Sequence, residues 1–341
     1  MSKHINLLVT GGCGFIGRHF IQLAQASKDV DFIVNVDSLT YAAADAPEYG
    51  TEKDTLVTDY GLFARGDINN TDLIKSLLVK YDIHAVINFA AETHVDNSIK
   101  SNDPFIHSNV LGTYSLLEAI KAIWGDRNDC KYIQVSTDEV YGHLAPKDPA
   151  FHPASPYNPR NPYSATKAAG DQLVMAYGNT YDLNVVVSHC SNNYGPYQHE
   201  EKLIPKTIQR AIAGQDIPVY GDGQQVRDWI YVTDHAQGIM DLLLGGCRPL
   251  GKHYCIGASN EIKNIDLVNT ICDLLDEKLK GMGSFRNQIK FVNDRAGHDR
   301  RYAINSSRMK QDFNWEPKTS FKKGLDKTVE YYLAKWHKKA D

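Results

Sequence analysis

Three regularly spaced glycines near the start of the chain constrain the fold more than any other feature. Gly11, Gly14 and Gly17 follow a short apolar run, Ile5–Thr10, and open a longer amphipathic segment, Phe15–Ala26. A glycine-rich turn between a strand and a helix lets the backbone approach a phosphate closely, and the N-terminus of the helix attracts negative charge. Such a spacing also occurs in ordinary tight turns. Its place between a predicted strand and a predicted helix favours a dinucleotide-binding turn.

The first half of the chain alternates short apolar runs with longer amphipathic segments. We expect further buried strands at Phe32–Asp37, Ala85–Phe89, Tyr132–Ser136 and Val185–His189. Helices are predicted at Thr71–Lys80, Pro104–Trp124 and Tyr163–Tyr181. Strands that are apolar at most positions are typical of parallel sheets covered on both faces. The repeated strand–helix–strand order therefore predicts an α/β fold with a doubly wound, parallel, Rossmann-type sheet.

The pattern changes after about Cys190. Gly, Pro, Asn and Tyr crowd Ser191–Tyr197, which predicts a loop. Shorter elements are expected beyond it: helices at Leu203–Ala213, after Thr233, at Ile265–Leu279 and at Phe321–Lys335, and strands at Ile217–Tyr220 and Asp228–Val232. We therefore expect two domains. Residues 1–190 form the dinucleotide-binding domain, with a later return near 228–257, and residues 191–341 form most of a smaller C-terminal α/β domain that binds the substrate.

Composition excludes several classes of protein. The 37 basic and 41 acidic side chains give a net charge of −4, which disfavours nucleic-acid binding by bulk charge. No run approaches the roughly 18 apolar residues of a membrane helix, and a signal-peptide pattern is not expected. The six cysteines form no CxxC pair and the 13 histidines show no metal-ligand spacing. We expect reduced thiols, no metal and a cytoplasmic protein.

Acidic residues stand where a dinucleotide would need them. Asp37 ends the second predicted strand, 20 residues after Gly17. A carboxylate there accepts hydrogen bonds from ribose hydroxyls and repels a 2′-phosphate, so NAD is expected rather than NADP. Asp67 and Ile68, at the end of the presumed third strand, are expected to meet the adenine.

A tyrosine and a lysine share one face of a predicted helix. Tyr163 and Lys167 are four residues apart, so both side chains can reach one cleft. A free tyrosine has a pKa of about 10, and a neighbouring ammonium favours the phenolate, which can accept a proton from a substrate hydroxyl. Such a pair on its own is more often surface packing.

A hydroxyl and two carboxylates follow the strand Tyr132–Ser136. Thr137, Asp138 and Glu139 lie at its C-terminal end, which faces the ligand crevice in a parallel sheet. Together they offer an acid and a base, although an exposed turn with a solvated charge pair is an equal interpretation of these residues alone. Strict strand alternation would send Asp138 and Glu139 to opposite faces. If both act on one substrate, the backbone has to leave strand geometry here.

These residues together resemble the extended short-chain dehydrogenase/reductase family and, within it, the dTDP-glucose 4,6-dehydratases. The supporting stretches span nearly the whole chain: DSLTYA (37–42), AAETHVD (90–96), STDEVYG (136–142), CSNNYGP (190–196), EKLIP (201–205), RDW (227–229) and GHDRRY (297–302). Epimerase relatives lack the pair formed by Asp138 and Glu139, which makes that pair the most informative feature. Ala296 departs from the family pattern, which usually has proline there.

The resemblance implies a redox-neutral dehydration. Tyr163, assisted by Lys167 and Thr137, would remove the proton of the glucose 4-hydroxyl while NAD takes the C4 hydride. Glu139 would then remove the C5 proton and Asp138 would protonate the departing 6-hydroxyl. Return of the hydride to C6 would give dTDP-4-keto-6-deoxyglucose and regenerate NAD.

The resemblance also implies two sets of binding residues. The cofactor set is Gly11, Gly14, Phe15, Ile16, Gly17, Asp37, Ser38, Leu39, Thr40, Asp67, Ile68, Phe89, Ala90, Ala91, Ser108, Tyr163, Lys167 and Asn193. The set for the nucleotide-sugar substrate is Thr93, Thr137, Asn192, Lys202, Leu203, Pro218, Val219, Tyr220, Arg227, Asn264, Asp294, Arg295, Ala296, Gly297 and His298. Arg227 and Arg295 suit a diphosphate because a guanidinium can bond two oxygens at once.

Three other functions remain open at this stage. The first is a UDP-glucose 4,6-dehydratase, although by resemblance the stretch GHDRR (297–301) favours the thymidine nucleotide. The second is a nucleotide-sugar 4-epimerase, which would not need Asp138 and Glu139. The third is an NAD-binding protein without activity, which would need none of the catalytic residues. No nucleic-acid or membrane partner is expected. A homodimer is expected because family members pair through helices, one of which bears Tyr163, with Pro104–Trp124 as its bundle partner.

Overall fold

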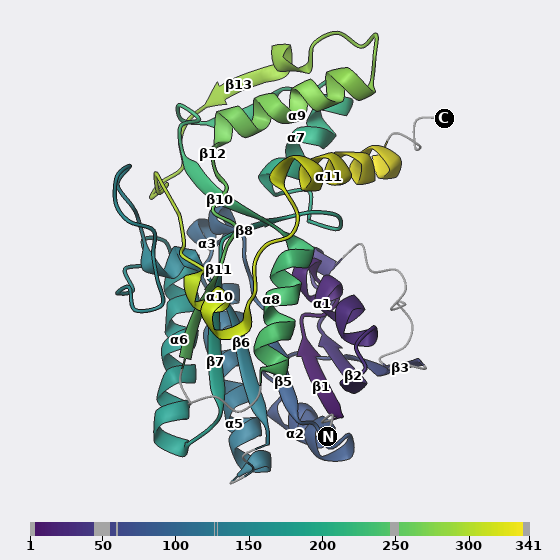
Figure 1. Cartoon of the computed structure of the whole chain (residues 1–341), viewed down its shortest axis with the longest axis vertical. Helices are drawn as coiled ribbons and strands as arrows, with labels where there is room; N and C mark the ends of the chain where they lie inside the picture. Colours follow the sequence, from purple (N-terminus) through teal and green to yellow (C-terminus); the bar gives the residue numbers. More distant parts are fainter. Residues whose placement is uncertain are drawn as a thin grey trace.

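The computed structural model describes residues 4–43, 61–125, 127, 129–245 and 252–336, together with the backbone of 55–58. A large sheet flanked by helices forms one part of the molecule, and a smaller group of strands and helices lies above it (Figure 1). No helix among the described residues is long and apolar enough to cross a bilayer. The described cysteines, at positions 13, 130, 190, 255 and 272, are buried and form no disulfide with one another, and Cys247 lies outside the described residues.

The large sheet has eight strands in the order β11-β7-β6-β5-β1-β2-β4-β3. Their bounds are β1 Ile5–Thr10, β2 Val30–Asp37, β3 Thr55–Thr58, β4 Gly61–Arg65, β5 Ala85–Asn88, β6 Lys131–Thr137, β7 Val185–Cys190 and β11 Lys252–Ile256. Every neighbouring pair is parallel except β3 with β4. The predicted doubly wound parallel sheet is therefore confirmed. The strand order reverses beside β1, and ligands bind at such a point, beyond the carboxyl ends of the strands.

Helices cover both faces of this sheet. Helices α1 (Phe15–Gln25) and α8 (Val232–Leu244) pack against each other on one face, where Phe20 and Ile239 are fully buried. The opposite face carries α2 (Thr71–Lys80), α5 (Thr113–Trp124) and α6 (Pro162–Tyr181). Burial on both faces explains why these strands are apolar at almost every position.

The helix expected at Pro104–Trp124 is interrupted. It consists of α4 (Asp103–Phe105), a π-helical stretch at Ile106–Gly112 and α5, and it follows the short helix α3 (Val95–Lys100). The side chain of Asn109, in the π-helical stretch, bonds the backbone of Glu92 and the hydroxyl of Thr166. Helical periodicity cannot predict this widening, because it serves contacts with Glu92, in the segment after β5, and with α6, which are distant in sequence.

The smaller part is built from two short sheets and three helices. Strands β8 (Asn192–Tyr194), β10 (Val226–Tyr231) and β12 (Glu261–Lys263) form one sheet, and β9 (Ile217–Tyr220) and β13 (Ile289–Val292) form the other. Helices α7 (Leu203–Ile212), α9 (Asn264–Lys278) and α11 (Phe321–Trp336) pack around a core that contains Ile208, Ile271 and Val329. Helix α10 (Ser307–Phe313) and the short helices Tyr41–Ala43, Asp138–Tyr141 and Phe285–Gln288 complete the described elements.

Two further sequence predictions need correction. The loop expected at Ser191–Tyr197 contains the strand β8, because Asn192 to Tyr194 pair in parallel with β10. The presumed third strand, β4, ends at Arg65, so Asp67 and Ile68 lie in the turn beyond it. The division into two domains stays a prediction. Strand β10 belongs to the smaller part, whereas α8 and β11 return to the large sheet.

Candidate active site

The segment after β6 leaves strand geometry at the point where the chemistry was expected. Thr137 ends the strand and caps a single turn of 3₁₀ helix, Asp138–Tyr141, with its hydroxyl oxygen accepting from the N–H of Glu139 at 3.3 Å. This turn replaces strand alternation, so Asp138 and Glu139 both line one cavity with Thr137. The backbone thus leaves strand geometry after Thr137, as it must if both carboxyls are to act on one substrate.

Asp138 and Glu139 have different surroundings. Asp138 is 2% exposed, and its Oδ2 atom has no hydrogen-bond partner among the described residues. Burial, followed by the negative charges of Glu139 and Asp228, raises the pKa of Asp138 well above its ordinary value. Glu139 is less buried and its Oε2 atom accepts from the hydroxyl of Ser164 at 3.4 Å. This asymmetry suits a protonated acid at Asp138 beside a base at Glu139.

Tyr163 and Lys167 project from the first turns of α6 into the same cavity. Helix α6 begins after Asn161, whose side chain accepts from the N–H of Ser164 at 2.9 Å. Burial and the charge of Glu139 raise the pKa of Tyr163 well above its ordinary value, and a hydrogen bond with Thr137 opposes this shift. The ammonium of Lys167 donates to the carbonyl of Val135 in β6 at 2.8 Å. The tyrosine therefore needs cationic surroundings to act as a base.

The glycine turn has the shape of a phosphate cradle. A Cβ on Gly11 would lie 2.6 Å from the N of Ala90, and one on Gly17 would lie 2.4 Å from the carbonyl oxygen of Gly11. Gly11 also has a φ of +69°, which disfavours any side chain. No side chain caps the N-terminus of α1, so the amide groups of its first turn can meet an anion. These residues fit the diphosphate of a dinucleotide.

Asp37 has a structural task in addition to the predicted one. Its Oδ2 atom accepts from the N–H of Cys13 at 2.9 Å and its Oδ1 atom from the N–H of Leu39 at 2.8 Å. A carboxylate offers about four acceptor sites, so two remain for ribose hydroxyls. Asp37, Asp67 and Ile68 line one further cavity with Gly11 and Ser108, and this cavity fits the adenosine part of the cofactor.

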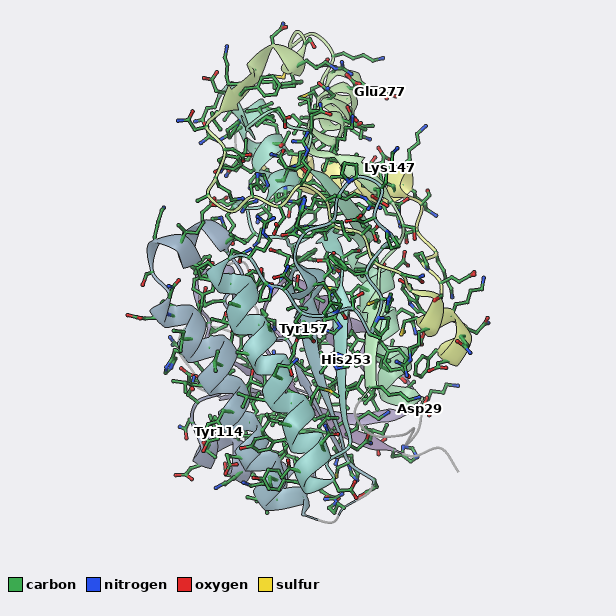
Figure 2. The ribbon with its side chains drawn as sticks, turned by 90° about the vertical axis from the view of Figure 1, so that its left-hand side faces the viewer. Asp29, Tyr114, Lys147, Tyr157, His253 and Glu277 are labelled. Carbon is green, nitrogen blue, oxygen red and sulfur yellow. The ribbon has the colours of Figure 1, made fainter. Side chains whose placement is uncertain are left out.

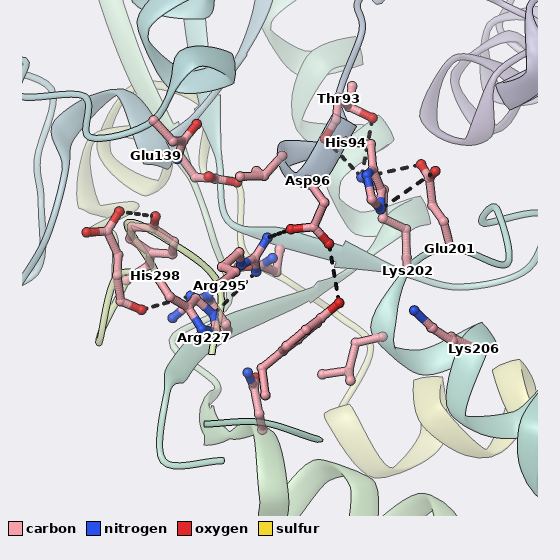
Figure 3. Close-up of a pocket in the computed structure, with 18 of the residues that line it drawn as sticks. Thr93, His94, Asp96, Glu139, Glu201, Lys202, Lys206, Arg227, Arg295 and His298 are labelled. Carbon is pink, nitrogen blue, oxygen red and sulfur yellow. Dashed lines mark hydrogen bonds and ion pairs between the residues drawn. The ribbon is translucent and has the colours of Figure 1, made fainter. Parts of the chain in front are cut away.

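Cations gather in a third cavity, which adjoins the first at Glu139 and Lys202 (Figure 3). Arg227 is buried, donates only to the carbonyls of Val226 and Asp299, and has no carboxylate within ion-pair distance among the described residues. Its guanidinium lies 4.3 Å from the ring centre of Tyr302. Because burial lowers the pKa of Arg227, an anionic ligand would be strongly favoured beside it.

Two further cations line this cavity. Lys202 donates to the carbonyl of Thr93 at 3.0 Å. Arg295 lies 3.5 Å from a carboxylate oxygen of Asp96, which also accepts from the hydroxyl of Tyr220 at 3.4 Å (Figure 3). The arrangement provides several positive groups at one end of a cleft whose other end carries the acid, the base and the tyrosine.

The structure brings almost all of the predicted site residues to these three cavities. Leu39 is an exception: its side chain packs beside Cys13 and Phe63. Asp294 and Ala296 are not among the residues that line these three cavities, and Asp294 instead accepts from Gln225 and contacts His298 at 2.5 Å. The roles of all these residues stay predictions.

Sequence reasoning passed over several residues that line the cavities, among them His94, Asp96, Asn161, Gln198, Glu201, Lys206 and Trp229. Asp96 and Glu201 stand inside stretches that support the family resemblance, and this was the available signal. For Asn109, which ties Glu92 to α6, no signal existed, because its partners are fixed only by the fold.

The fold and site define an α/β protein with a glycine turn suited to a dinucleotide beside a cleft lined by cations and carboxyls. Residues 8–328 match the family model described as GDP-mannose 4,6 dehydratase. The chain is 46% identical to the dTDP-glucose 4,6-dehydratase of Xanthomonas campestris pv. campestris (strain B100), covering 96% of this chain and 92% of that one. It is 43% identical to dTDP-glucose 4,6-dehydratase 1 of Escherichia coli (strain K12), covering 97% and 94%.

Solved structures agree with these relatives. A Streptomyces venezuelae dTDP-glucose 4,6-dehydratase determined with NAD bound is similar with a TM-score of 0.86 and 38% identity, covering 98% of this chain and 99% of that one. A UDP-glucuronic acid 4-epimerase from Bacillus cereus has a TM-score of 0.84 at 26% identity, with 97% and 100% covered. The chain belongs to the GDP-mannose 4,6 dehydratase family. The two curated relatives named here, which it matches over nearly their full length, are dTDP-glucose 4,6-dehydratases.

Proposed function

We propose that this chain is an NAD-dependent dTDP-glucose 4,6-dehydratase, a hydro-lyase that forms dTDP-4-keto-6-deoxyglucose. The observation that carries the proposal is the meeting of Thr137, Asp138, Glu139 and Tyr163 in one cavity between a cofactor cradle and a cationic pocket. An epimerase acting at C4 needs no acid and base beyond the tyrosine. The pair of carboxyls is therefore the feature that favours dehydration.

The first step is oxidation at C4. The chemistry that NAD supplies when bound is reversible hydride uptake at its nicotinamide ring. Tyr163 accepts the proton of the 4-hydroxyl, and the hydrogen bond with Thr137 supports the phenolate. Lys167, four residues further along the same helix face, is proposed to support it with its charge. The products of this step are a 4-ketone on the sugar and a protonated Tyr163.

The second step is loss of water across C5 and C6. The 4-ketone acidifies the C5 proton, and Glu139 removes it as base. Asp138, protonated because burial raises its pKa, gives its proton to the 6-hydroxyl, which leaves as water. The hydride then enters at C6 and a proton returns to C5, so the net change is the loss of one water molecule and no oxidant is consumed.

The predicted binding residues keep their proposed roles. The diphosphate lies between Arg227 and Arg295, because these are the guanidinium groups of the cationic cavity. Lys202, Tyr220 and His298 hold the rest of the nucleotide sugar. A carboxylate at Asp37 selects NAD over NADP.

The chain is further proposed to act as a cytoplasmic homodimer. Exposed apolar side chains follow the outer side of the π-helical stretch, α5 and α6: Ile106 is 45% exposed, Leu111 49%, Tyr114 47% and Tyr181 46% (Figure 2 labels Tyr114). A second copy placed on this face would bury them, and the free thiols suit a reducing compartment. Sedimentation is expected to give twice the monomer mass, and a Leu111→Glu variant is expected to sediment as a monomer.

The test is proton NMR of dTDP-glucose incubated with the purified protein without added NAD. A new C6 methyl doublet is expected, because the cofactor is regenerated and stays bound. A parallel sample of UDP-glucose ranks the nucleotides, and faster reaction of the uridine compound would correct the proposed substrate. Unchanged sugar with NAD added, or a galactose derivative, would contradict dehydration.

A further inference from the structure

A buried polar network lies behind the catalytic end of α6 and has no part in the mechanism above. It centres on Asp171, which is fully buried in α6 one helical turn after Lys167. The Oδ2 atom of Asp171 accepts from the hydroxyl of Ser136 at 2.6 Å and from that of Tyr157 at 3.2 Å. The Nε2 atom of His189 lies 2.7 Å from the Tyr157 oxygen and 3.4 Å from Asp171.

The donors of this network can all find acceptors if the hydrogen bonds run from Tyr141 through His189 and Tyr157 to Asp171. The hydroxyl of Tyr141 donates to Nδ1 of His189, over 3.0 Å, and the Nε2–H of the same ring donates to Tyr157. Tyr157 and Ser136 then donate to Asp171. In this arrangement His189 needs only one ring proton, and the donors lead towards Asp171, whose Oδ2 atom accepts from both Tyr157 and Ser136.

The carboxyl group of Asp171 has no cationic side chain of arginine or lysine in contact with it among the described residues. Its Oδ1 atom, although buried, has no hydrogen-bond partner among those residues. Lys167 also lacks a charged partner: the residue is 3% exposed, and its ammonium donates to the carbonyl of Val135 and to no carboxylate among the described residues. Residues four apart share a helix face, so the two unpaired charges are neighbours in a dry interior.

The same residues connect α6 to β6. Lys167 bonds Val135 and Asp171 bonds Ser136, and these consecutive residues of β6 lead directly into Thr137. We propose that Asp171 is a positioning residue of the proton-transfer step: its buried carboxylate keeps the Lys167 ammonium charged and holds α6 in register with Thr137. The inference rests on the proposed function for its effect on turnover, but its effect on Lys167 does not depend on that function.

The electrostatics of the cluster agree with this assignment. Burial lowers the pKa of Lys167, and the charge of Asp171 opposes that shift. Loss of the carboxylate would therefore let Lys167 release its proton at a lower pH, and the phenolate of Tyr163 would lose its cation.

Other titratable groups face Lys167 and Asp171, and their effect on the titration of Lys167 must be distinguished from that of Asp171. They are Tyr132 in β6, Tyr141 and Tyr157 after it, His189 and Cys190 in β7, and His253 in β11, which lies beside Tyr157 (Figure 2). Burial raises the pKa of the three tyrosines and that of Cys190, to about 12 for the cysteine, and lowers the pKa of His253 to about 4. Of these side chains, His189 requires a control variant, because its ring lies 3.4 Å from Asp171 and can take up a proton. Tyr163, also on α6, lines the catalytic cavity and is treated separately.

The test is an NMR titration of lysine side chains in the NAD-bound protein, made with isotope-labelled lysine and assigned by Lys167→Met. In Asp171→Asn the midpoint of Lys167 is expected to fall by about one pH unit, since loss of one neighbouring charge shifts a buried group by that order. Ser136→Ala, which removes a hydrogen bond and keeps the charge, and His189→Gln, which removes the imidazole, are expected to leave the midpoint in place.

Turnover supplies the second readout. The loss of kcat in Asp171→Asn is expected to be about tenfold greater near pH 9.5 than near pH 6.5, with KM changed less than about twofold. A purely structural role would lower kcat by the same factor at both pH values. An unmoved Lys167 midpoint in a folded Asp171→Asn protein would overturn the proposal.

The experiment separates two kinds of failure. Wild-type protein that forms no methyl doublet would contradict the proposed function, while the NMR midpoint would still judge the role of Asp171. If Asp171→Asn does not fold, Asp171→Glu keeps the charge: a midpoint close to the wild-type value supports the proposal, and a midpoint lowered by about one pH unit contradicts it.

Discussion

The two ends of the catalytic cleft are constructed in different ways. The proposed cofactor end is made from backbone and small residues: Gly11 and Gly17 leave room that no side chain could share, and the amides of α1 provide partial positive charge. The proposed nucleotide-sugar end, the cationic end, is made from long cationic side chains, including Arg227 and Arg295, which come from segments far apart in the chain. The first end is encoded locally and the second depends on the completed fold.

This difference predicts how mutations divide between kcat and KM. Changes among the reacting groups at the junction of the two ends remove interactions made in the transition state and lower kcat. Changes at the cationic end remove binding shared by ground state and transition state, so they raise KM. The predictions below test this division, beginning with the largest expected effect.

Tyr163→Phe is expected to lower kcat by about 10³-fold, because a positioned base contributes on the order of 10² to 10⁴. KM for dTDP-glucose is expected to change by less than about threefold, since the phenol is not part of the cationic end. Steady-state kinetics with NMR detection of the methyl product measure both. A variant that retained most of its kcat would place the C4 base elsewhere.

Glu139→Gln and Asp138→Asn are expected to lower kcat by about 10²-fold or more, but to block different half-reactions. In D₂O, exchange of the C5 hydrogen is expected to stop in Glu139→Gln and to continue in Asp138→Asn, because the proposed mechanism assigns removal of that proton to Glu139. The two variants are controls for each other. The reverse pattern would exchange the roles of acid and base.

The pH dependence distinguishes the same two carboxyls. Asp138 must be protonated to act as acid, and its pKa is raised by burial, so wild-type kcat is expected to fall as pH rises through that pKa. This limb is expected to be missing from the residual activity of Asp138→Asn, which carries no ionisable group there. A limb that persists in the variant would belong to another residue.

Arg227→Met is expected to raise KM about 10- to 100-fold with a smaller change in kcat, since hydrogen bonds to a charged group contribute about 1.5–3 kcal/mol. The substitution removes a buried cation that has no carboxylate partner among the described residues, so the melting temperature is not expected to fall sharply. Arg300→Met is the matched control, because Arg300 pairs with Asp222 outside the cleft. An equal effect in both variants would contradict a diphosphate site at Arg227.

Asp37→Asn is expected to give the smallest effect, a loss of NAD affinity of about tenfold, measured as cofactor retained after dialysis. The amide keeps one acceptor for Cys13 or Leu39 and loses the negative charge that repels a 2′-phosphate. Binding of NADP relative to NAD is therefore expected to improve. Unchanged preference would mean that Asp37 serves only to hold the turn.

The comparison of the two ends also explains what could be predicted from the sequence. The parallel sheet and the glycine turn could be predicted because they follow from local patterns. These patterns are the apolar strands and the glycine spacing that directly follows the first strand. The interrupted helix at Ile106–Gly112 does not, because its cause is the contact of Asn109 with Glu92 and Thr166. Strand β8 was missed for the same reason, since its partner β10 lies more than 30 residues further along the chain.

The proposed catalytic residues include some that local sequence patterns predict and others that depend on the completed fold. The proximity of Tyr163 and Lys167 follows from helix periodicity, and the need for a turn after Thr137 follows from strand periodicity. The cationic cavity was reached only through family resemblance, and Asp171 was not reached at all. Its partners Ser136, Tyr157 and His189 lie in three separate segments, and burial turns their ordinary polar side chains into one network.

The central claim is that oxidation at C4, loss of water and reduction at C6 occur on one substrate with one retained cofactor. The most direct measurement uses dTDP-glucose carrying deuterium at C4, incubated with the protein without added NAD. The deuterium is expected at C6 of dTDP-4-keto-6-deoxyglucose, seen by NMR as a monodeuterated methyl group. Label that remains at C4, or that is lost to the solvent, would contradict the account.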